Sequence, residues 1–333
     1  MQQENSGASR PATDEPFLLL GGSGFIGSRL AGRLSEKGIP FRIGDRRPSD
    51  LFPDLWNACD VRDRESLRAQ CHRVKGIVNL AAEHRDDVRP VSRYHETNVE
   101  GASQVCQAAR EAAIPKIIFT SSVAVYGFHP HPVGEEGPFH PFNSYGETKL
   151  SAEAIYQAWA NEDPARSLVI VRPTVVFGEG NRGNVYNLLH QIVTGRFMMV
   201  GSGKNVKSMA YVGNLVDFFI HTLSLGSGVH IFNYVDGPDL DMNTLVDHVM
   251  RCLGKSGPRY LRIPRPLALV GGHTVDGVAR IAGRTFPISA VRIRKFCENT
   301  QFRADRLLQS GFHPEYSLKE ALAQTIAFEF STR

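Results

Sequence analysis

Short apolar runs alternate with amphipathic stretches along the first half of the chain. The runs begin at Phe17, Phe41, Gly76 and Lys116, and the segments between them carry apolar residues at helical spacing. Strands of a parallel sheet read as continuous apolar runs, because helices cover both faces of the sheet. The pattern therefore predicts an α/β fold, with a doubly wound parallel sheet and right-handed crossovers.

The second half of the chain has a more mixed pattern. Short strands are predicted at 198–200, 230–234 and 260–263, and a C-terminal helix is predicted over 317–330. Residues 1–16 are polar and predict a disordered tail. We therefore expect a first domain over 17–174 and a smaller C-terminal α/β substrate lobe over 175–333, with the chain able to cross back between them.

Composition narrows the classes of partner. The 38 basic and 34 acidic residues leave a net charge of only +4, which argues against nucleic acid. Five widely spaced cysteines indicate reduced thiols in a cytoplasmic protein, and the histidine spacing predicts no metal site. The apolar segment 264–281 is too polar to span a bilayer. We expect an amphipathic helix packed on the protein, with a helix on a membrane surface as the alternative, and no membrane partner.

A glycine-rich turn follows the first predicted strand. Gly21, Gly24 and Gly27 stand between the apolar run at Phe17 and a helical pattern that begins at Phe25. Glycines allow close backbone approach, and the N-terminal end of a helix attracts anions. This arrangement predicts a Rossmann-type seat for the pyrophosphate of a dinucleotide, although the spacing departs from the commonest form.

Two acidic residues follow the next predicted strands. Asp45 ends the second strand, 18 residues after Gly27, where a carboxylate can bind the ribose hydroxyls of an adenosine. Arg46 and Arg47 come directly afterwards and would favour a 2′-phosphate, so the carboxylate predicts NAD and the arginines keep NADP open. Asp60 lies after the third strand, before a helix for which Asp63 is a candidate cap.

A hydroxyl, a phenol and an amine form the candidate catalytic set. Ser122 ends the strand that starts at Lys116, at the sheet edge where open α/β sheets bind ligands. Tyr145 and Lys149 are four residues apart and share one face of the following helix. A nearby ammonium stabilises a phenolate and lowers the pKa of the tyrosine. The three residues together predict a site for proton transfer.

These motifs resemble the extended short-chain dehydrogenase/reductases, and most closely the nucleotide-sugar branch of the NAD-dependent epimerase/dehydratase family typified by UDP-galactose (UDP-glucose) 4-epimerase. The resemblance covers most of residues 17–230. It implies that Ser122, Tyr145 and Lys149 are catalytic and that the protein forms a homodimer. It also implies a set of NAD-binding residues: Gly21, Ser23, Gly24, Phe25, Ile26, Gly27, Asp45, Arg46, Asp60, Val61, Leu80, Ala81, Ala82, Asn98, Tyr145, Lys149 and Thr174.

The resemblance extends to the substrate and has two departures. It implies that a nucleotide sugar contacts Ser122, Tyr145, Asn184, Val185, Lys207 and Arg294, with Arg292 as the alternative to Arg294. The 4,6-dehydratases of this branch carry an acidic pair where this chain has Val123 and Ala124, so dehydration is not expected. Val175 replaces an asparagine of the 4-epimerase, which leaves the sugar undetermined.

The predicted reaction is reversible hydride transfer at C4 of a UDP-hexose or UDP-N-acetylhexosamine, with NAD as the cofactor. In an epimerase the 4-keto sugar turns over and the hydride returns to its other face. A reductase that consumes NAD(P)H on a 4-keto sugar would use the same residues and is the alternative. A non-catalytic NAD-binding sensor and a steroid-type dehydrogenase fit the residues less well.

Overall fold

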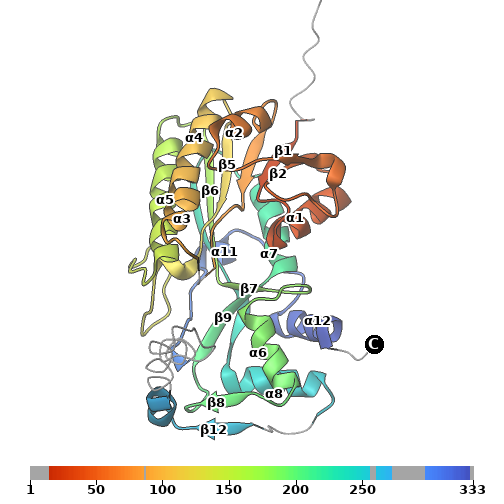
Figure 1. Ribbon diagram of the computed structural model, residues 1–333, viewed down its shortest axis with the longest axis vertical. Helices are drawn as coiled ribbons and strands as arrows, with labels where there is room; N and C mark the ends of the chain where they lie inside the picture. Colours follow the sequence, from red (N-terminus) through yellow and green to blue (C-terminus); the bar gives the residue numbers. More distant parts are fainter. Residues whose placement is uncertain (1–14, 86–87, 256–259, 272–296, 331–333) are drawn as a thin grey trace, which may run out of the picture. The chain divides into compact units, whose positions relative to one another are not determined.

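A computed structural model describes residues 15–85, 88–255, 260–271 and 297–330, and these residues divide into two units. The first unit comprises residues 1–121, 143–171 and 219–231, and the second comprises 122–142, 172–218 and 232–333. The helices and strands are labelled in Figure 1.

The first unit contains a seven-stranded sheet in the order β10-β6-β5-β4-β1-β2-β3. The pairs from β3 to β6 are all parallel, so the predicted parallel sheet is confirmed. The strand β10 follows the second unit's elements in sequence but joins the edge of this sheet, whereas the sequence predicted its residues among the strands of the smaller lobe. The strands are β1 (Phe17–Leu20), β2 (Phe41–Asp45), β3 (Trp56–Ala58), β4 (Gly76–Asn79), β5 (Lys116–Thr120), β6 (Ser167–Pro173) and β10 (Gly228–Tyr234).

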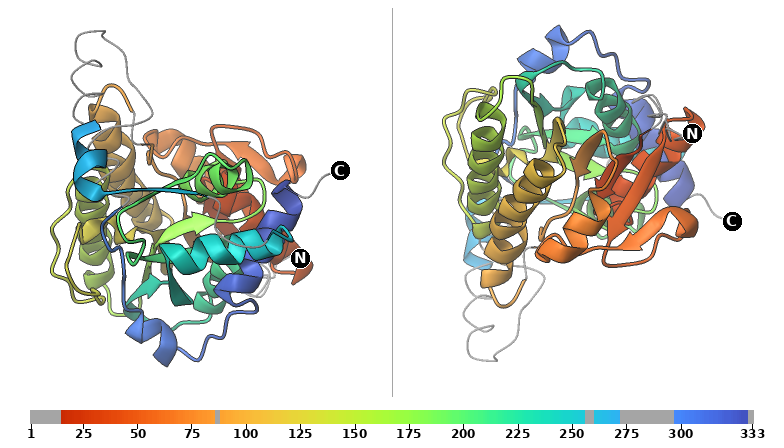
Figure 2. Two further views of the ribbon diagram at one scale, coloured as in Figure 1. Left: turned by 90° about the horizontal axis from the view of Figure 1, so that it is seen from below. Right: turned by 90° about the horizontal axis from the view of Figure 1, so that it is seen from above.

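Helices cover the sheet because their apolar faces match the buried strands. Helices α4 and α5 lie side by side, as Figures 1 and 2 show. Their buried residues pack in one core with leucine, isoleucine and phenylalanine side chains of β1, β4 and β5. Asp63 caps α2 by accepting a hydrogen bond from the Glu65 amide, as predicted. The helices of this unit are α1 (Phe25–Glu36), α2 (Arg64–Gln70), α3 (Ser92–His95), a π-helix (Glu96–Glu100), α4 (Gly101–Glu111) and α5 (Ser144–Asn161). A further helix, α7 (Val212–Thr222), contains a point at which the chain passes from one unit to the other.

The described residues of the second unit form two small sheets, with several helices beside them. The strand β9 (Val206–Tyr211) pairs with β7 (Val175–Phe177) and β11 (Asp236–Asp241), and β8 (Met198–Val200) pairs in parallel with β12 (Leu261–Ile263). The helices α6 (Asn184–Val193), α8 (Met242–Cys252) and α12 (Leu318–Phe330) pack on one another, and α11 (Asp305–Gln309) is short. Leu318, Ala321, Leu322 and Thr325 are buried, on the face of the C-terminal helix that the sequence predicts.

The segment after β12 differs from its prediction. Residues 265–271 are helical, but the side chains of Leu267 and Val270 are each 65% exposed. The expectation of a helix packed on the protein is therefore wrong for these two residues. The remainder of that predicted segment, 272–281, lies outside the described residues, as does nearly all of the predicted tail.

Candidate active site

The glycine turn after β1 has no room for side chains. Gly21 has a φ of +77°, and a Cβ added there would lie 2.7 Å from the backbone nitrogen of Ala81. A Cβ on Gly27 would lie 2.5 Å from the carbonyl oxygen of Gly21. The turn therefore leaves backbone amides uncovered at the start of α1, which is the shape that a pyrophosphate requires. Residues 21–27 thus fit a dinucleotide.

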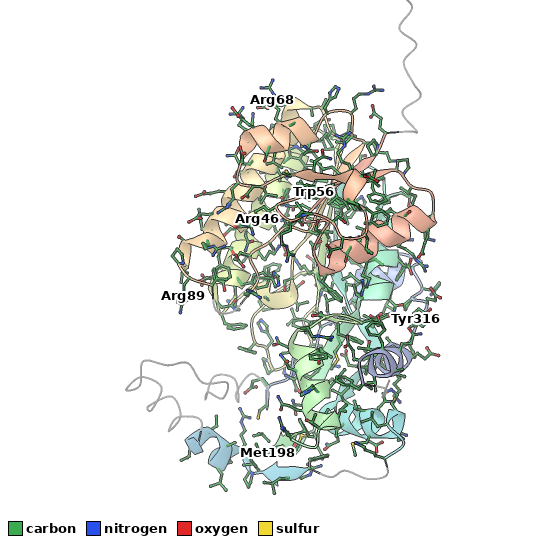
Figure 3. The ribbon with its side chains drawn as sticks, turned by 45° about the vertical axis from the view of Figure 1, so that its right-hand side comes forward. Arg46, Trp56, Arg68, Arg89, Met198 and Tyr316 are labelled. Carbon is green, nitrogen blue, oxygen red and sulfur yellow. The ribbon has the colours of Figure 1, made fainter. Side chains whose placement is uncertain are left out.

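Asp45 at the end of β2 binds this turn. Its carboxylate accepts hydrogen bonds from the backbone amides of Ser23 and Arg47, both at 3.0 Å, and the Ser23 hydroxyl donates to the carbonyl of Arg47 at 2.8 Å. The exposed Arg46, labelled in Figure 3, lies between Asp45 and Arg47 in sequence. The structure therefore brings the predicted residues Ser23, Asp45 and Arg46 together beside the glycine turn.

Asp60 after β3 is engaged by a neighbouring arginine. The Arg62 guanidinium donates to its carboxylate, with a shortest distance of 2.7 Å, and this bond lowers the pKa of Asp60. The adjacent Val61 is buried and faces Gly101 of α4, where an added Cβ would lie 3.0 Å from a Val61 methyl group. A ligand that binds beside Asp60 would therefore meet a carboxylate that is already hydrogen-bonded to Arg62.

The segment after β4 is held by two buried asparagines. Asn79 accepts from the Ala81 amide at 3.0 Å and donates to the Tyr156 hydroxyl at 2.7 Å. Asn98, in the π-helix, both accepts from and donates to the backbone of Glu83, and it donates to the Thr148 hydroxyl at 3.0 Å. These bonds position Leu80, Ala81 and Ala82 against the glycine turn and use the amide group of Asn98 within the protein.

Helix α5 presents three polar side chains at four-residue spacing. Asn143 caps the helix through a hydrogen bond from the Gly146 amide, which places Tyr145 in the first turn. Lys149 is buried, and its Nζ donates to the Thr120 carbonyl at 2.7 Å. Burial lowers the pKa of Lys149 to about 7, whereas the Glu153 carboxylate one turn further along raises it. An amine that titrates near neutrality is suited to assist proton transfer.

Glu153 is a functional candidate that the sequence analysis missed. Its side chain is 1% exposed and accepts a hydrogen bond from the Ser121 hydroxyl. The spacing of Tyr145, Lys149 and Glu153 is the signal that could have revealed it, because residues four and eight apart share a helix face. Unpaired burial of a carboxylate is costly, so a buried glutamate beside a buried lysine indicates mutual compensation.

The remaining predicted residues belong to the second unit. Ser122 accepts from the Ala124 amide at 3.1 Å and caps a short 3₁₀ turn, Val123–Val125. Thr174 is buried and donates to the Tyr234 carbonyl. Asn184 and Val185 begin α6, and the predicted Arg294 and its alternative Arg292 lie outside the described residues.

Lys207 of β9 lies close to a polar cavity of about 320 Å³. Its Nζ donates to the Glu298 carbonyl at 2.6 Å, and burial lowers the pKa of Lys207 to about 8. Glu298 lines the cavity together with Val200, Lys204, Asn205, Arg265 and Cys297. Arg265 pairs with the Glu298 carboxylate at 2.6 Å. The basic groups at the cavity suit an anionic ligand.

The described residues offer neither a metal centre nor a membrane-spanning helix. Within the described residues, no group of three or more His, Cys, Asp or Glu side chains is arranged to hold a metal ion. The same part of the chain has no helix long and apolar enough to cross a membrane. The predicted homodimer and cytoplasmic location stay predictions.

Comparisons with known proteins identify the class. The model of the NAD dependent epimerase/dehydratase family matches residues 17–234, and the chain belongs to that family. It is 46% identical over 321 residues to N-acetyl-α-D-glucosaminyl-diphospho-ditrans,octacis-undecaprenol 4-epimerase of Escherichia coli O157:H7. The matched region covers 95% of this chain and 96% of that protein.

Other proteins are similar to this chain at lower sequence identity or in their fold. The chain is 26% identical over 310 residues to UDP-glucose 4-epimerase of Vibrio cholerae, covering 89% of this chain and 93% of the relative. The solved UDP-glucose 4-epimerase of Thermus thermophilus, a complex with NAD, is similar with a TM-score of 0.72 and 19% identity over 94% of this chain and 98% of that one.

Proposed function

We propose that this chain is an NAD-dependent 4-epimerase whose substrate is N-acetylglucosamine linked through a diphosphate to a polyprenol. The observation that carries the proposal is the 46% identity, over nearly the full length of both chains, to the Escherichia coli epimerase of that lipid-linked sugar. The sequence predicted a nucleotide as the carrier of the sugar. Relatives that act on UDP-glucose match this chain at much lower identity, so we favour the polyprenol.

NAD is the cofactor that the residues support. The glycine turn would hold the pyrophosphate and Asp45 the adenosine ribose, because the turn excludes side chains and the carboxylate lies beside it. When bound, NAD supplies the acceptor and donor of the hydride. Lys149 is the candidate for the nicotinamide ribose, and Leu80, Ala81 and Ala82 provide small groups near that half of the cofactor.

Proton transfer is assigned to the first turn of α5. Tyr145 as a phenolate removes the proton of the C4 hydroxyl while the hydride leaves C4, and it returns the proton after the 4-keto sugar has turned over. Ser122 hydrogen-bonds the same oxygen. The ammonium charge of Lys149 lowers the pKa of Tyr145. Burial lowers the pKa of Lys149 itself to about 7.

The deciding experiment supplies purified protein with N-acetylglucosaminyl-diphospho-undecaprenol or UDP-N-acetylglucosamine, with no added cofactor. Release and analysis of the sugar should show N-acetylgalactosamine from the lipid-linked substrate and little from the nucleotide. Faster conversion of UDP-N-acetylglucosamine than of the lipid-linked sugar would instead support the nucleotide-linked substrate that the sequence predicted. Failure of both, with stoichiometric NAD(P)H consumption on a 4-keto sugar, would instead identify a reductase.

Replacing Lys207 tests whether this residue binds the diphosphate. Lys207→Met should raise KM about tenfold to a hundredfold with little change in kcat, because a charge-assisted hydrogen bond contributes about 1.5–3 kcal/mol. Steady-state kinetics measure both constants. Lys319→Met is the matched control, because it removes an exposed lysine of α12 that is not assigned to the site. It should leave KM unchanged. Equal KM values for the Lys207→Met variant and the wild type would remove Lys207 from the site.

The pH dependence gives a second measurement on Lys207. Its pKa is lowered to about 8, so its ammonium charge is lost as the pH rises through 8. The KM of the wild type should therefore rise above pH 8. Lys207→Arg should show a flat KM over this range, since a guanidinium stays charged.

Replacing Glu153 tests its effect on Lys149. Glu153→Gln keeps an acceptor for Ser121 but removes the charge that raises the pKa of Lys149. Thr120 and Phe119, which also contact the Lys149 amine, are neutral. The ammonium should therefore be lost at lower pH. The rate, which should fall as Lys149 loses its charge, should begin to fall at a lower pH than in the wild type. Glu153→Asp should keep the wild-type profile more closely, and a Glu153→Gln profile identical to wild type would contradict the role.

A further inference from the structure

Exposed apolar side chains gather around the two-stranded sheet of the second unit. Leu261 of β12 is in register with Met198 of β8, and their side chains are 65% and 45% exposed (Figure 3 labels Met198). Leu267 and Val270 of the following helical segment are each 65% exposed and, three residues apart, lie on one side of it. We call these four side chains the β12 surface.

The charge around the β12 surface is mainly positive. Residues 194–205, 260–271 and 297–299 include the basic residues Arg196, Lys204, Arg262 and Arg265, and Glu298 is their one acidic residue. The Arg262 guanidinium is fixed by the Ser202 carbonyl at 2.9 Å and by the Asn243 side chain at 2.7 Å. Apolar side chains bordered by basic ones are typical of proteins that lie on anionic lipid surfaces.

The polar cavity that Glu298 lines adjoins the β12 surface. Val200, the last residue of β8, lines the cavity, and so does Arg265 at the start of the helical segment that carries Leu267 and Val270. A ligand with a diphosphate in this cavity would therefore have exposed apolar side chains next to it. A diphosphate attached to a long hydrocarbon chain has this combination of groups, and its hydrocarbon part belongs in a bilayer.

We propose that the β12 surface docks on an anionic lipid bilayer, with Leu261, Leu267 and Val270 among the acyl chains and Arg262 and Arg265 at the headgroups. The polyprenyl chain then stays in the bilayer while the diphosphate enters the adjacent cavity. The identity of the tail rests on the proposed function, whereas bilayer docking is measured without it. This surface departs from the expectation, drawn from the sequence, that the protein has no membrane partner.

Vesicle sedimentation of the full chain tests the docking. The wild type should sediment with phosphatidylcholine vesicles that contain a quarter phosphatidylglycerol, and less with phosphatidylcholine alone or at high salt. The double variant Leu267→Asp/Val270→Asp should bind at least about tenfold more weakly. Leu308→Asp on α11 is the matched control, since Leu308 is 79% exposed and outside the surface, and it should bind as the wild type does.

Turnover separates this proposal from the proposed function. The double variant should epimerise N-acetylglucosaminyl-diphospho-geraniol, a water-soluble short-chain substrate, at the wild-type rate and lose activity on vesicle-borne undecaprenyl substrate. Docking is overturned if the wild type does not sediment with any of the vesicles, or if the double variant binds them as tightly as the wild type does. It is also overturned if the double variant changes only a dimer seen by size-exclusion chromatography. Vesicle binding without any epimerisation would support docking and contradict the proposed function.

Discussion

Replacing Tyr145 with phenylalanine should lower the rate of epimerisation by about a hundredfold to ten-thousandfold, the range that general acid–base groups contribute. The variant keeps the ring in the first turn of α5 and loses only the hydroxyl that would accept the C4 proton. The Asn143 cap uses the Gly146 amide and is unaffected by the change. The protein should therefore fold and retain NAD while its chemical step fails.

The measurement compares turnover of the lipid-linked sugar with NAD content and thermal stability in the same preparations. Tyr316→Phe in the second unit removes a hydroxyl from a tyrosine outside the proposed machinery and should keep the wild-type rate. Substrate affinity of the Tyr145→Phe variant should change little, because the group acts mainly in the transition state. A rate within twofold of wild type, with NAD retained, would exclude Tyr145 as the proton-transfer group.

Replacing Gly27 with alanine should empty the NAD site and destabilise the protein. A Cβ at this position would lie 2.5 Å from the Gly21 carbonyl oxygen and 2.6 Å from the Cα of Gly22, and both are backbone atoms that cannot rotate away. Overpacking of this kind costs about 1–3 kcal/mol, and the turn must open to relieve it. The amides that would bind the pyrophosphate then lose their alignment.

Gly32→Ala on the same helix is the matched control. A Cβ at Gly32 meets nothing within 4 Å, and the position lies inside α1. This change should stabilise the protein by about 0.5–1 kcal/mol and leave NAD content unchanged. Absorbance of nucleotide released on denaturation measures the content, and denaturant titration measures the free energy of unfolding. Full NAD content in the Gly27→Ala variant would show that the turn is not the seat.

Local patterns in the sequence were sufficient where the structure is local. The strand at Phe17, the cap at Asp63 and the buried face of the C-terminal helix follow from apolar periodicity and turn chemistry, and all three are confirmed. The residues of β10 were recognised as a strand, but their place at the edge of the large sheet depends on a partner, β6, some sixty residues earlier. Periodicity carries no information about such a partner.

Side-chain roles that depend on distant partners were also beyond the sequence. Glu153 reads as an ordinary charged residue of a helix, and its burial follows from the packing of α5 over the strand that ends before Ser121. Asn98 was predicted to line the cofactor, which stays a prediction, and the sequence did not reveal that its amide is engaged by Glu83 and Thr148. The apolar periodicity around Leu267 predicts a helix face but not what covers it.

Asp45 also limits how the cofactor preference of this protein could be engineered. Exchange of an acidic residue at this position is the obvious way to admit a 2′-phosphate, with Arg46 and Arg47 already in place. Here, however, the same carboxylate accepts the amides of Ser23 and Arg47, so alanine would leave two backbone donors without partners and loosen the glycine turn. Asparagine keeps one of the two acceptors and removes the charge, which makes it the more suitable starting point for an NADP-dependent variant.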